Sequence, residues 1–505
     1  MRLRLSGFKL DARREAPLYQ QLFDQIAERC RSGTFPPGHR LPATRTLAIE
    51  LGAHRNTVVR AYLDLETAGF VTSRVGKGTF VAASLPTAQR AAPAQRSALP
   101  WASLVAPHAI AEPLGRFDRL ARAYQRTDLV QLGNMHPSAE LLPIELFQRC
   151  LDHTLRQLGS QALTYGPREG LPRLRAVIAE DLGRQGVPAT AEDVIITTGS
   201  QQALDLVVRT LVRPGDAFVL DTLTYPGAAN LLVCAGASLL CVPGDDEGPS
   251  MDQLARLGHA VKGYYTMPYG HNPTAVTMSL RRREALLDWS HRAGVPLIED
   301  DYSSDLAFEG EPPPPPLRAL DREVILIGSF SKKLIPALRI GFLLCPPALR
   351  AVLISLKHTL DLGSSALLQH ALAEFLERGY LRAHISRLLP EYRARRDALE
   401  EGLLAHLPHG ARWRRSSGAL HLWLPLPAGY NPEEVTDEAR RRGVVVTPST
   451  LYALEPREQP GLRLTFCAEP PERLREGARR LGRALTALSP RRPASPREGA
   501  NLGVV

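Results

Sequence analysis

Short β-rich runs that alternate with amphipathic helical segments from about residue 116 onward constrain the fold more than any other feature. The clearest runs are 194–198, 217–220, 237–242, 295–299 and 324–327. Strands that alternate with helices favour an α/β domain with a largely parallel sheet. We therefore expect one large α/β domain over residues 116–488, followed by a disordered tail over 489–505.

The first 81 residues differ from the rest of the chain in charge. Residues 1–80 hold thirteen lysines and arginines against seven acids, so +6 of the net +10 lies there and the remaining 425 residues carry only +4. Such a block points to a polyanionic partner, usually nucleic acid, although a solvated basic surface would account for the charge equally well. An Ala- and Pro-rich stretch over 82–115 then indicates an extended linker.

The sequence also favours one cellular compartment. The six cysteines form no CxxC pair, which argues against a zinc site or a disulfide framework and fits a reducing environment. The N-terminal residues lack the apolar segment of a signal peptide, and no run of about 20 apolar residues occurs. We expect a soluble, cytoplasmic protein.

Residues 1–81 carry three helical patterns and a strand pair. The helices are expected over 18–31, 44–51 and 54–68, and an alternating pattern around Gly76 and Gly78 predicts a β-hairpin wing over 71–81. Two helices joined by a short turn, the second with a polar N-terminal end, have the geometry that reads the major groove of DNA. A solvated helix end would carry the same residue types.

The combined pattern resembles the winged helix-turn-helix of the GntR family, through APLYQQLFDQI, GTFPPGHRLPATRTLA, HRNTVVRAYLDLETAGF and GKGTFV. The resemblance covers about residues 15–81 and implies a DNA-binding domain over 1–81. By position in the motif, the DNA contacts would be Arg45, Arg55, Asn56, Thr57 and Lys77. His54 stands where Ser or Thr is more common.

In the large domain, the first of four chemical motifs is GSFSKKLIPALRIGF, at 328–342. Lys332 lies just past an expected strand, with Ser329 three residues before it and Arg339 seven after. A desolvated lysine there would be a nucleophilic amine, and Ser329 and Arg339 would bind a phosphate beside it. Lys333 is the neighbouring alternative, but the SxxK and KxxxxxxR spacings favour Lys332.

The other three motifs also follow expected strands. In PLIEDDYSSDL, Asp300 could keep a pyridine nitrogen protonated, or the paired carboxylates could bind Mg²⁺, although no phosphate-binding Gly-Lys loop accompanies them. In ITTGSQQALDLV, Ser200 and the helix N-terminus could seat a phosphate. In GYYTMPYGHNPTA, Asn272 can present its amide.

Together, and in this order, the four motifs resemble fold-type I pyridoxal 5′-phosphate (PLP) enzymes of the aspartate aminotransferase superfamily, over about residues 130–487. The resemblance implies a smaller C-terminal α+β subdomain and Lys332 as the Schiff-base, catalytic lysine. It implies that Asp300 pairs with the ring nitrogen, that Tyr302 and Asn272 bind the ring hydroxyl, and that Tyr225 stacks on the ring. The phosphate would be held by Ser200, Gln201, Ser329 and Arg339, an effector carboxylate by Arg463, and Tyr165 would reach the partner subunit's cofactor.

A GntR-type DNA-binding domain joined to an aminotransferase-like domain resembles the MocR/GabR family of bacterial transcription regulators. That resemblance implies a head-to-tail homodimer that binds operator DNA, with PLP held on Lys332 as an aldimine and, together with an amino-compound effector, modulating DNA binding. A working aminotransferase with a secondary winged helix and a PLP domain that serves only for dimerisation are the alternatives. Two departures from the family pattern are Ala275, where Gly is usual, and Leu223, where Pro is common.

Overall fold

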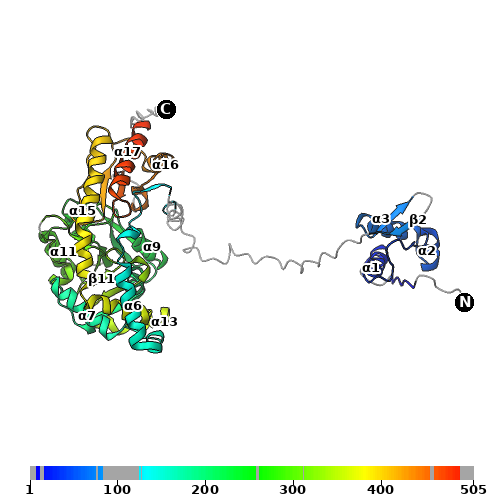
Figure 1. The fold of residues 1–505 in the computed structure, drawn as a ribbon, viewed down its shortest axis with the longest axis horizontal. Helices are drawn as coiled ribbons and strands as arrows, with labels where there is room; N and C mark the ends of the chain where they lie inside the picture. The colour runs from blue at the N-terminus through cyan, green and yellow to red at the C-terminus, as the bar shows by residue number, and fades with distance from the viewer. Residues whose placement is uncertain are drawn as a thin grey trace, which may run out of the picture. The chain divides into compact units, whose positions relative to one another are not determined.

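The computed structural model describes residues 7–11, 16–74, 78–83, 124, 126, 128–257, 261–310, 312–454 and 460–488. The chain divides into two compact units, Met1–Leu104 and Val105–Val505, which we describe separately (Figure 1). Most of the expected linker, the expected tail and Lys77 lie outside the described residues. Within the described part of the chain, no helix combines the length and apolar character needed to cross a membrane.

The described residues of the first unit form three helices and a two-stranded antiparallel sheet. These are α1 (Leu18–Arg31), α2 (Thr44–Leu51), α3 (Arg55–Thr67), β1 (Val71–Arg74) and β2 (Gly78–Val81). Val58, Tyr62 and Leu65 recur at helical spacing on α3 and are buried against Leu22 and Ile26 of α1. The helical patterns and the hairpin expected from the sequence are therefore confirmed.

The second unit is built around a seven-stranded sheet in the order β4-β12-β11-β10-β9-β5-β6. Its strands are β4 (Val194–Thr197), β5 (Ala217–Asp221), β6 (Ser238–Val242), β9 (Val261–Thr266), β10 (Leu297–Asp301), β11 (Ile325–Ser329) and β12 (Gly341–Leu344). All neighbouring pairs are parallel except those of β12, which is antiparallel to β4 and to β11. The expected, largely parallel sheet is confirmed, with one reversed strand.

Helices cover both faces of this sheet. Along β4, Ile195 packs into one core cluster and Ile196 into another, as the alternation of side chains along a strand requires. The helices of this part of the unit are α6 (Ile144–Leu158), α7 (Pro172–Arg184), α8 (Ser200–Leu211), α9 (Pro226–Cys234), α10 (Met251–Leu257), α11 (Leu280–Ala293), α12 (Leu317–Leu320), α13 (Pro347–Asp361) and α14 (Ala366–Glu377). Because β5, β9, β10 and β11 run parallel to one another, their carboxyl ends meet at one edge of the sheet, where ligands of α/β proteins bind.

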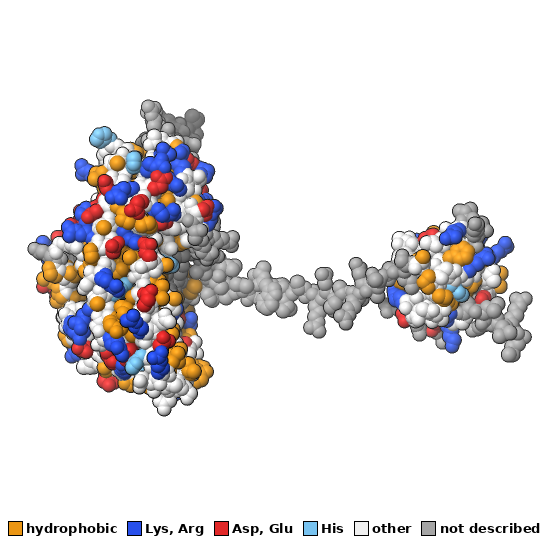
Figure 2. Space-filling model, viewed as in Figure 1, with side chains coloured by type: hydrophobic (Ala, Val, Ile, Leu, Met, Phe, Trp, Pro, Cys, Tyr) orange, Lys and Arg blue, Asp and Glu red, His pale blue; other side chains and the backbone are white. Residues whose placement is uncertain are grey.

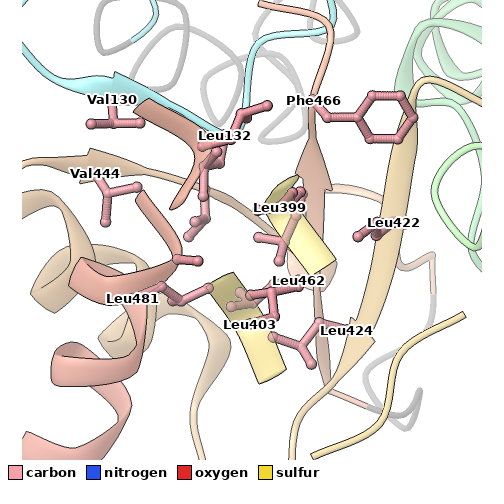
Figure 3. Close-up of a cluster of buried hydrophobic side chains, with 14 of the residues drawn as sticks. Val130, Leu132, Leu399, Leu403, Leu422, Leu424, Val444, Leu462, Phe466 and Leu481 are labelled. Atoms are coloured by element: carbon pink, nitrogen blue, oxygen red, sulfur yellow. The ribbon is translucent and has the colours of Figure 1, made fainter. Parts of the chain in front are cut away.

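A smaller α+β subdomain completes the second unit, as expected. Its sheet joins β13 (His421–Pro425), β16 (Gly461–Thr465) and β15 (Thr447–Pro448), and a second pair joins β3 (Val130–Gln131) to β14 (Val444–Val445). The helices are α15 (Tyr380–His406), α16 (Pro432–Arg441) and α17 (Pro471–Ala487). Figure 3 shows Leu399 and Leu403 of α15 facing Leu462 of β16 across a buried leucine-rich core.

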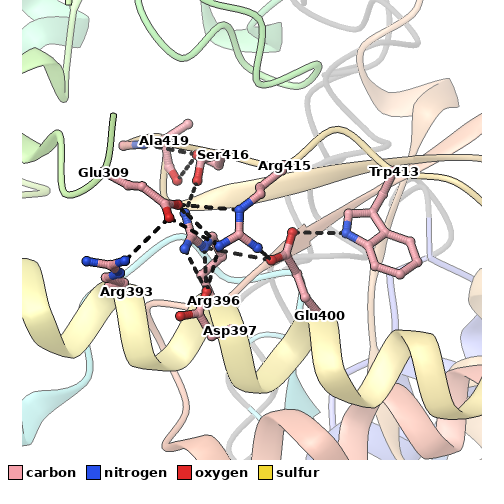
Figure 4. A network of polar contacts seen from close by, with 10 residues as sticks. Glu309, Arg393, Arg396, Asp397, Glu400, Trp413, Arg415, Ser416 and Ala419 are labelled. Atoms are coloured by element: carbon pink, nitrogen blue, oxygen red, sulfur yellow. Dashed lines mark hydrogen bonds and ion pairs between the residues drawn. The ribbon is translucent and has the colours of Figure 1, made fainter. Parts of the chain in front are cut away.

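A polar network ties α15 to the loop that precedes β13 (Figure 4). The Arg396 side chain is fully buried, pairs with Glu309, donates to the Ser416 carbonyl oxygen at 2.7 Å and lies over the Phe308 ring. Glu400 accepts from Trp413 Nε1 at 3.0 Å and pairs with Arg415. These contacts satisfy charged groups that would otherwise be costly to bury.

Candidate functional site

The site begins at Lys332, in the turn that follows β11. Its Nζ donates to the Met135 carbonyl oxygen at 2.8 Å. Burial lowers the pKa of this amine to about 8, and the positive charges of Arg463 and Arg339 act in the same direction. A neutral amine is therefore accessible near physiological pH, as a nucleophilic lysine requires.

The neighbouring Lys333 has a different environment. Its Nζ pairs with Asp305 at 2.5 Å and lies 5.3 Å from the centre of the Phe330 ring. Although burial opposes the charged form, the Asp305 carboxylate raises the pKa of Lys333 above its ordinary value. Lys333 therefore remains a cation in a structural ion pair, whereas Lys332 is the amine with the lowered pKa.

Asp300 is the penultimate residue of β10. It lies near the turn that carries Lys332, because β10 pairs in parallel with β11 and places Asp300 opposite Ile327. One carboxylate oxygen accepts from the Tyr265 hydroxyl at 2.7 Å, and the other is buried without a hydrogen-bond partner among the described residues. Burial raises the pKa of Asp300 to about 6. A buried carboxylate with a free oxygen can accept a hydrogen bond from a ring N–H.

An anion cradle forms where α8 begins. Gly199 precedes Ser200 at a φ of +79°, and a Cβ placed on it would lie 2.6 Å from a guanidinium nitrogen of Arg339. The glycine thus lets the guanidinium approach the N-terminus of α8, where backbone N–H groups and the helix dipole favour an anion. Among the described residues no carboxylate pairs with Arg339. Ser329 is buried, and its hydroxyl accepts from the Ser331 N–H at 3.1 Å.

Tyr225 and Gln201 are hydrogen-bonded to each other. The Tyr225 hydroxyl donates to Gln201 Oε1 at 3.1 Å, and Gln201 Nε2 donates to the Gly227 carbonyl oxygen at 3.1 Å. Burial and the negative charge of Asp300 raise the pKa of Tyr225 to about 12, while Arg339 opposes this shift. The aromatic side chain is therefore a neutral phenol held near both Asp300 and Arg339.

Arg463 links the small subdomain to this site. It lies on β16, is buried, and donates to Asn272 Oδ1 at 3.1 Å and to the Gly133 carbonyl oxygen at 2.6 Å. Its Nε is buried without a partner among the described residues. Tyr302 donates its hydroxyl to the Gly270 carbonyl oxygen. Both Asn272 and Tyr302 thus have protein partners in this structure.

The remaining expected site residues are Tyr165 and the residues of the first unit. Tyr165 is 85% exposed and forms no hydrogen bond to a described residue. In the first unit, Arg45, Arg55 and Asn56 are exposed and Thr57 is half-buried, while Lys77 lies outside the described residues. The His54 ring accepts from the Asn56 N–H at 3.2 Å and so caps α3 where Ser or Thr is usual.

Sequence reasoning missed three groups of the site. Tyr265, on β9, holds Asp300, and the carbonyl oxygens of Met135 and Gly133 hold Lys332 and Arg463. Tyr265 lies within the GYYTMPYGHNPTA motif, but its pairing with Asp300 depends on the order of the strands, which the motif does not indicate. Backbone carbonyl groups leave no signal in residue type, so the other two could only be found in the structure.

Comparison with known families matches both units. Residues 18–81 match the family of bacterial regulatory proteins, gntR family, and residues 133–481 match aminotransferase class I and II. The second match spans more than half of the chain and contains every candidate residue of the cluster around Lys332.

Individual relatives give the same division. The transcriptional regulator TauR of Rhodobacter capsulatus is 31% identical over 96% of this chain and 100% of its own length. The probable rhizopine catabolism regulatory protein MocR of Rhizobium meliloti is 30% identical over 95% and 96%. The α-aminoadipate aminotransferase LysN of Thermus thermophilus, solved with N-(5′-phosphopyridoxyl)-L-leucine, is 32% identical, with a TM-score of 0.71 over 77% of this chain and 99% of LysN.

The relatives differ in how much of the chain they match. LysN covers 77% of this chain, whereas the regulators TauR and MocR cover 96% and 95% of it. The chain belongs to the aminotransferase class I and II family and, through its GntR-family N-terminal domain, to the MocR-type transcription regulators.

Proposed function

We propose that the protein is a DNA-binding regulator in which PLP, attached through Lys332, modulates DNA binding together with an amino-compound effector. The observation that carries this proposal is the buried Lys332 amine, whose pKa is lowered to about 8. A domain used only for dimerisation has no need of a desolvated amine beside two arginines.

The residues present fit PLP at three separate points. The unpartnered oxygen of Asp300 would accept from the pyridine N–H. The cradle between Arg339 and the start of α8, with Ser200, Gln201 and Ser329, would hold the phosphate. Tyr225 would stack on the ring, and Asn272 and Tyr302 would turn towards the ring hydroxyl.

When bound, PLP supplies an electrophilic carbon and an electron sink for an amine ligand. The chain's own residues set how that chemistry is used. Lys332 would provide the amine and Asp300 would keep the ring nitrogen protonated. Arg463 would bind an effector carboxylate or a similar anion in exchange for its contact with Asn272. Because Arg463 belongs to the small subdomain, an effector that binds it would favour one position of that subdomain.

Such a shift alters DNA binding only if the effector has different affinities for the two arrangements. The exposed start of α3, with Arg55 and Asn56, would carry the DNA contacts. The family resemblance supports a head-to-tail homodimer in which the linker over 82–115 spans the two subunits. The 85% exposed Tyr165 is available to reach the partner subunit's cofactor in that arrangement.

The test is DNA binding by purified full-length protein to the region upstream of its own gene, with and without PLP. We expect PLP to change the affinity or the footprint of the wild type, and to have no effect on Lys332→Ala. Lys333→Arg, which keeps the ion pair with Asp305, is the matched control and should behave as the wild type. If PLP binds but leaves DNA binding of the wild type unchanged, the proposal is wrong.

A second candidate function is transamination, because the large domain aligns with a solved aminotransferase at 32% identity. The cluster around Lys332 contains the groups such a reaction needs. Sustained turnover of an amino donor with a 2-oxo acid would support an enzyme, whereas a single half-reaction that stops after one equivalent would not.

A further inference from the structure

Seven arginines line an open groove of about 710 Å³ on the small subdomain. The groove lies between the C-terminal end of α16, the C-terminal half of α17 and the residues that precede β3. In Figure 2, Lys and Arg side chains gather at the end of the second unit that carries α17. The lining arginines are Arg126, Arg440, Arg441, Arg442, Arg479, Arg480 and Arg483.

Acidic residues in the groove do not balance this charge. Only Asp128 and Glu476 line it, and two further acids, Asp437 and Glu438, pair with its arginines from outside. Counting all four acids, the groove keeps an excess of three positive charges. Residues 81–505 carry a net +4, of which two charges belong to Arg90 and Arg96 ahead of the second unit, so residues 105–505 carry only +2, less than the excess of three within the groove.

Several of these guanidinium groups are available to a ligand. The side chain of Arg441 is 66% exposed, and Arg483 is exposed and pairs with no acid among the described residues. Arg440 pairs only with Asp437, three residues earlier, and both side chains are about half exposed, so this pair contributes little to stability. An incoming anion can therefore replace the Asp437 carboxylate at little cost.

Hydrogen bonds of Arg479 and Arg480 fix the walls of the groove. Arg480 Nη1 donates to the Gly443 carbonyl oxygen at 2.9 Å, and Gly443 has a φ of +85°, so the turn after α16 is fixed against α17. Hydrogen bonds from Arg479 and Arg480 hold the pKa of Glu476 at about 2. Glu476 therefore remains ionised and keeps both guanidinium groups oriented.

We propose that this groove binds the phosphate backbone of DNA that extends beyond the segment read by the N-terminal domain. Planar guanidinium groups bind phosphate oxygens in pairs, and a row of them without an apolar wall suits a repeating polyanion better than a protein surface. The groove carries no base-reading element, so its contribution to binding is independent of sequence. This inference rests on DNA binding by the first unit, which the proposed function includes.

The test compares salt dependence of DNA binding for full-length proteins on one long duplex, containing the region upstream of the gene. The variant is Arg440→Gln, Arg441→Gln and Arg483→Gln combined. The control, Arg184→Gln, Arg209→Gln and Arg292→Gln, removes the same charge from exposed positions on α7, α8 and α11. The slope of log K against log salt is negative, and each lost phosphate contact reduces its magnitude by about 0.9.

We expect the groove variant to reduce the magnitude of that slope by about 2 to 3 and to weaken binding at moderate salt by roughly tenfold or more. The control should leave the slope and the affinity near those of the wild type. Equal slopes for groove variant and control would overturn the proposal and leave the proposed function intact. If wild type does not bind DNA, the proposed function itself fails. Thermal unfolding and cofactor absorbance check that each variant is folded. If the triple variant is unstable, Arg441→Gln alone must reduce the magnitude of the slope by about 1.

Discussion

At the scale of single residues, the proposed attachment of PLP to Lys332 predicts a pH dependence. Its pKa of about 8 lies below that of an ordinary lysine, because burial disfavours the charged form. Only the neutral amine attacks an aldehyde, so capture of PLP by apoprotein should accelerate as pH rises from about 6 and level off above about 8. Stopped-flow absorbance of apoprotein mixed with PLP measures this rate. A profile that still rises steeply between pH 9 and pH 10 would contradict the lowered pKa.

Ala275 occupies a backbone conformation that suits glycine. Its φ is +57°, and its N–H donates to the His271 carbonyl oxygen at 2.6 Å. A left-handed conformation costs a residue with a Cβ about 1 to 2 kcal/mol. Replacement by glycine removes this cost, but part of the gain is offset because glycine loses more conformational entropy on folding. Ala275→Gly should therefore stabilise the large domain by about 0.5 to 1 kcal/mol in thermal unfolding. Ala285→Gly, inside α11, is the control and should destabilise it by about 1 kcal/mol.

Residue types at fixed spacing gave candidates for the site, and not how each side chain is held. The SxxK and KxxxxxxR spacings favour Lys332 over Lys333, and the structure gives the two lysines different partners. The hydrogen bond from Tyr265 to Asp300 joins adjacent strands that are far apart in sequence. Such a pairing depends on strand order, which a local pattern does not contain.

At the scale of elements, α3 should carry sequence recognition. Arg55 and Asn56 are exposed at its first turn, while Val58 and Tyr62 anchor the helix in the core. Replacing either exposed residue by Ala should weaken specific DNA binding by about 1 to 3 kcal/mol, because each can form a bidentate contact with a base. Fluorescence anisotropy with the upstream duplex measures this loss. Arg60→Ala, on the same helix and paired with Asp64, should change binding little.

The long helix α15 depends on the buried guanidinium of Arg396. Removing it leaves Glu309 and the Ser416 carbonyl oxygen without their shared donor. We expect Arg396→Ala to destabilise the large domain by about 3 to 5 kcal/mol in denaturant unfolding. Arg393 lies one turn earlier, is 54% exposed and makes only a 3.5 Å contact with Glu309. Arg393→Ala should cost less than about 0.5 kcal/mol, and equal losses for the two variants would contradict this account.

Element type was predictable from the sequence, whereas strand direction was not. Apolar runs between amphipathic segments correctly indicated β4, β5, β10 and β11. The reversed strand β12 follows β11 after a short connection without a long crossover helix, and it inserts between β4 and β11. The alternation of strand and helix patterns does not indicate the direction of a strand that is joined to its neighbour by a short, irregular connection.

At the scale of the whole molecule, Tyr165 makes the arrangement of subunits testable. It is 85% exposed, and Leu163 beside it is 67% exposed, so both side chains are available to a second subunit. If Tyr165 reaches the partner subunit's cofactor, each site combines Lys332 of one chain with Tyr165 of the other. Two defective chains can then form one intact site.

Coexpression of differently tagged Lys332→Ala and Tyr165→Ala chains, followed by purification of the mixed dimer, provides this test. One site of the mixed dimer lacks Lys332 and also faces the altered Tyr165, whereas the other has both groups intact. We expect about half of the sites to retain PLP through gel filtration as firmly as wild type, although the Tyr165→Ala homodimer releases it faster. The absorbance of the bound cofactor measures retention. If the mixed dimer releases PLP as fast as that homodimer, Tyr165 does not act across the interface.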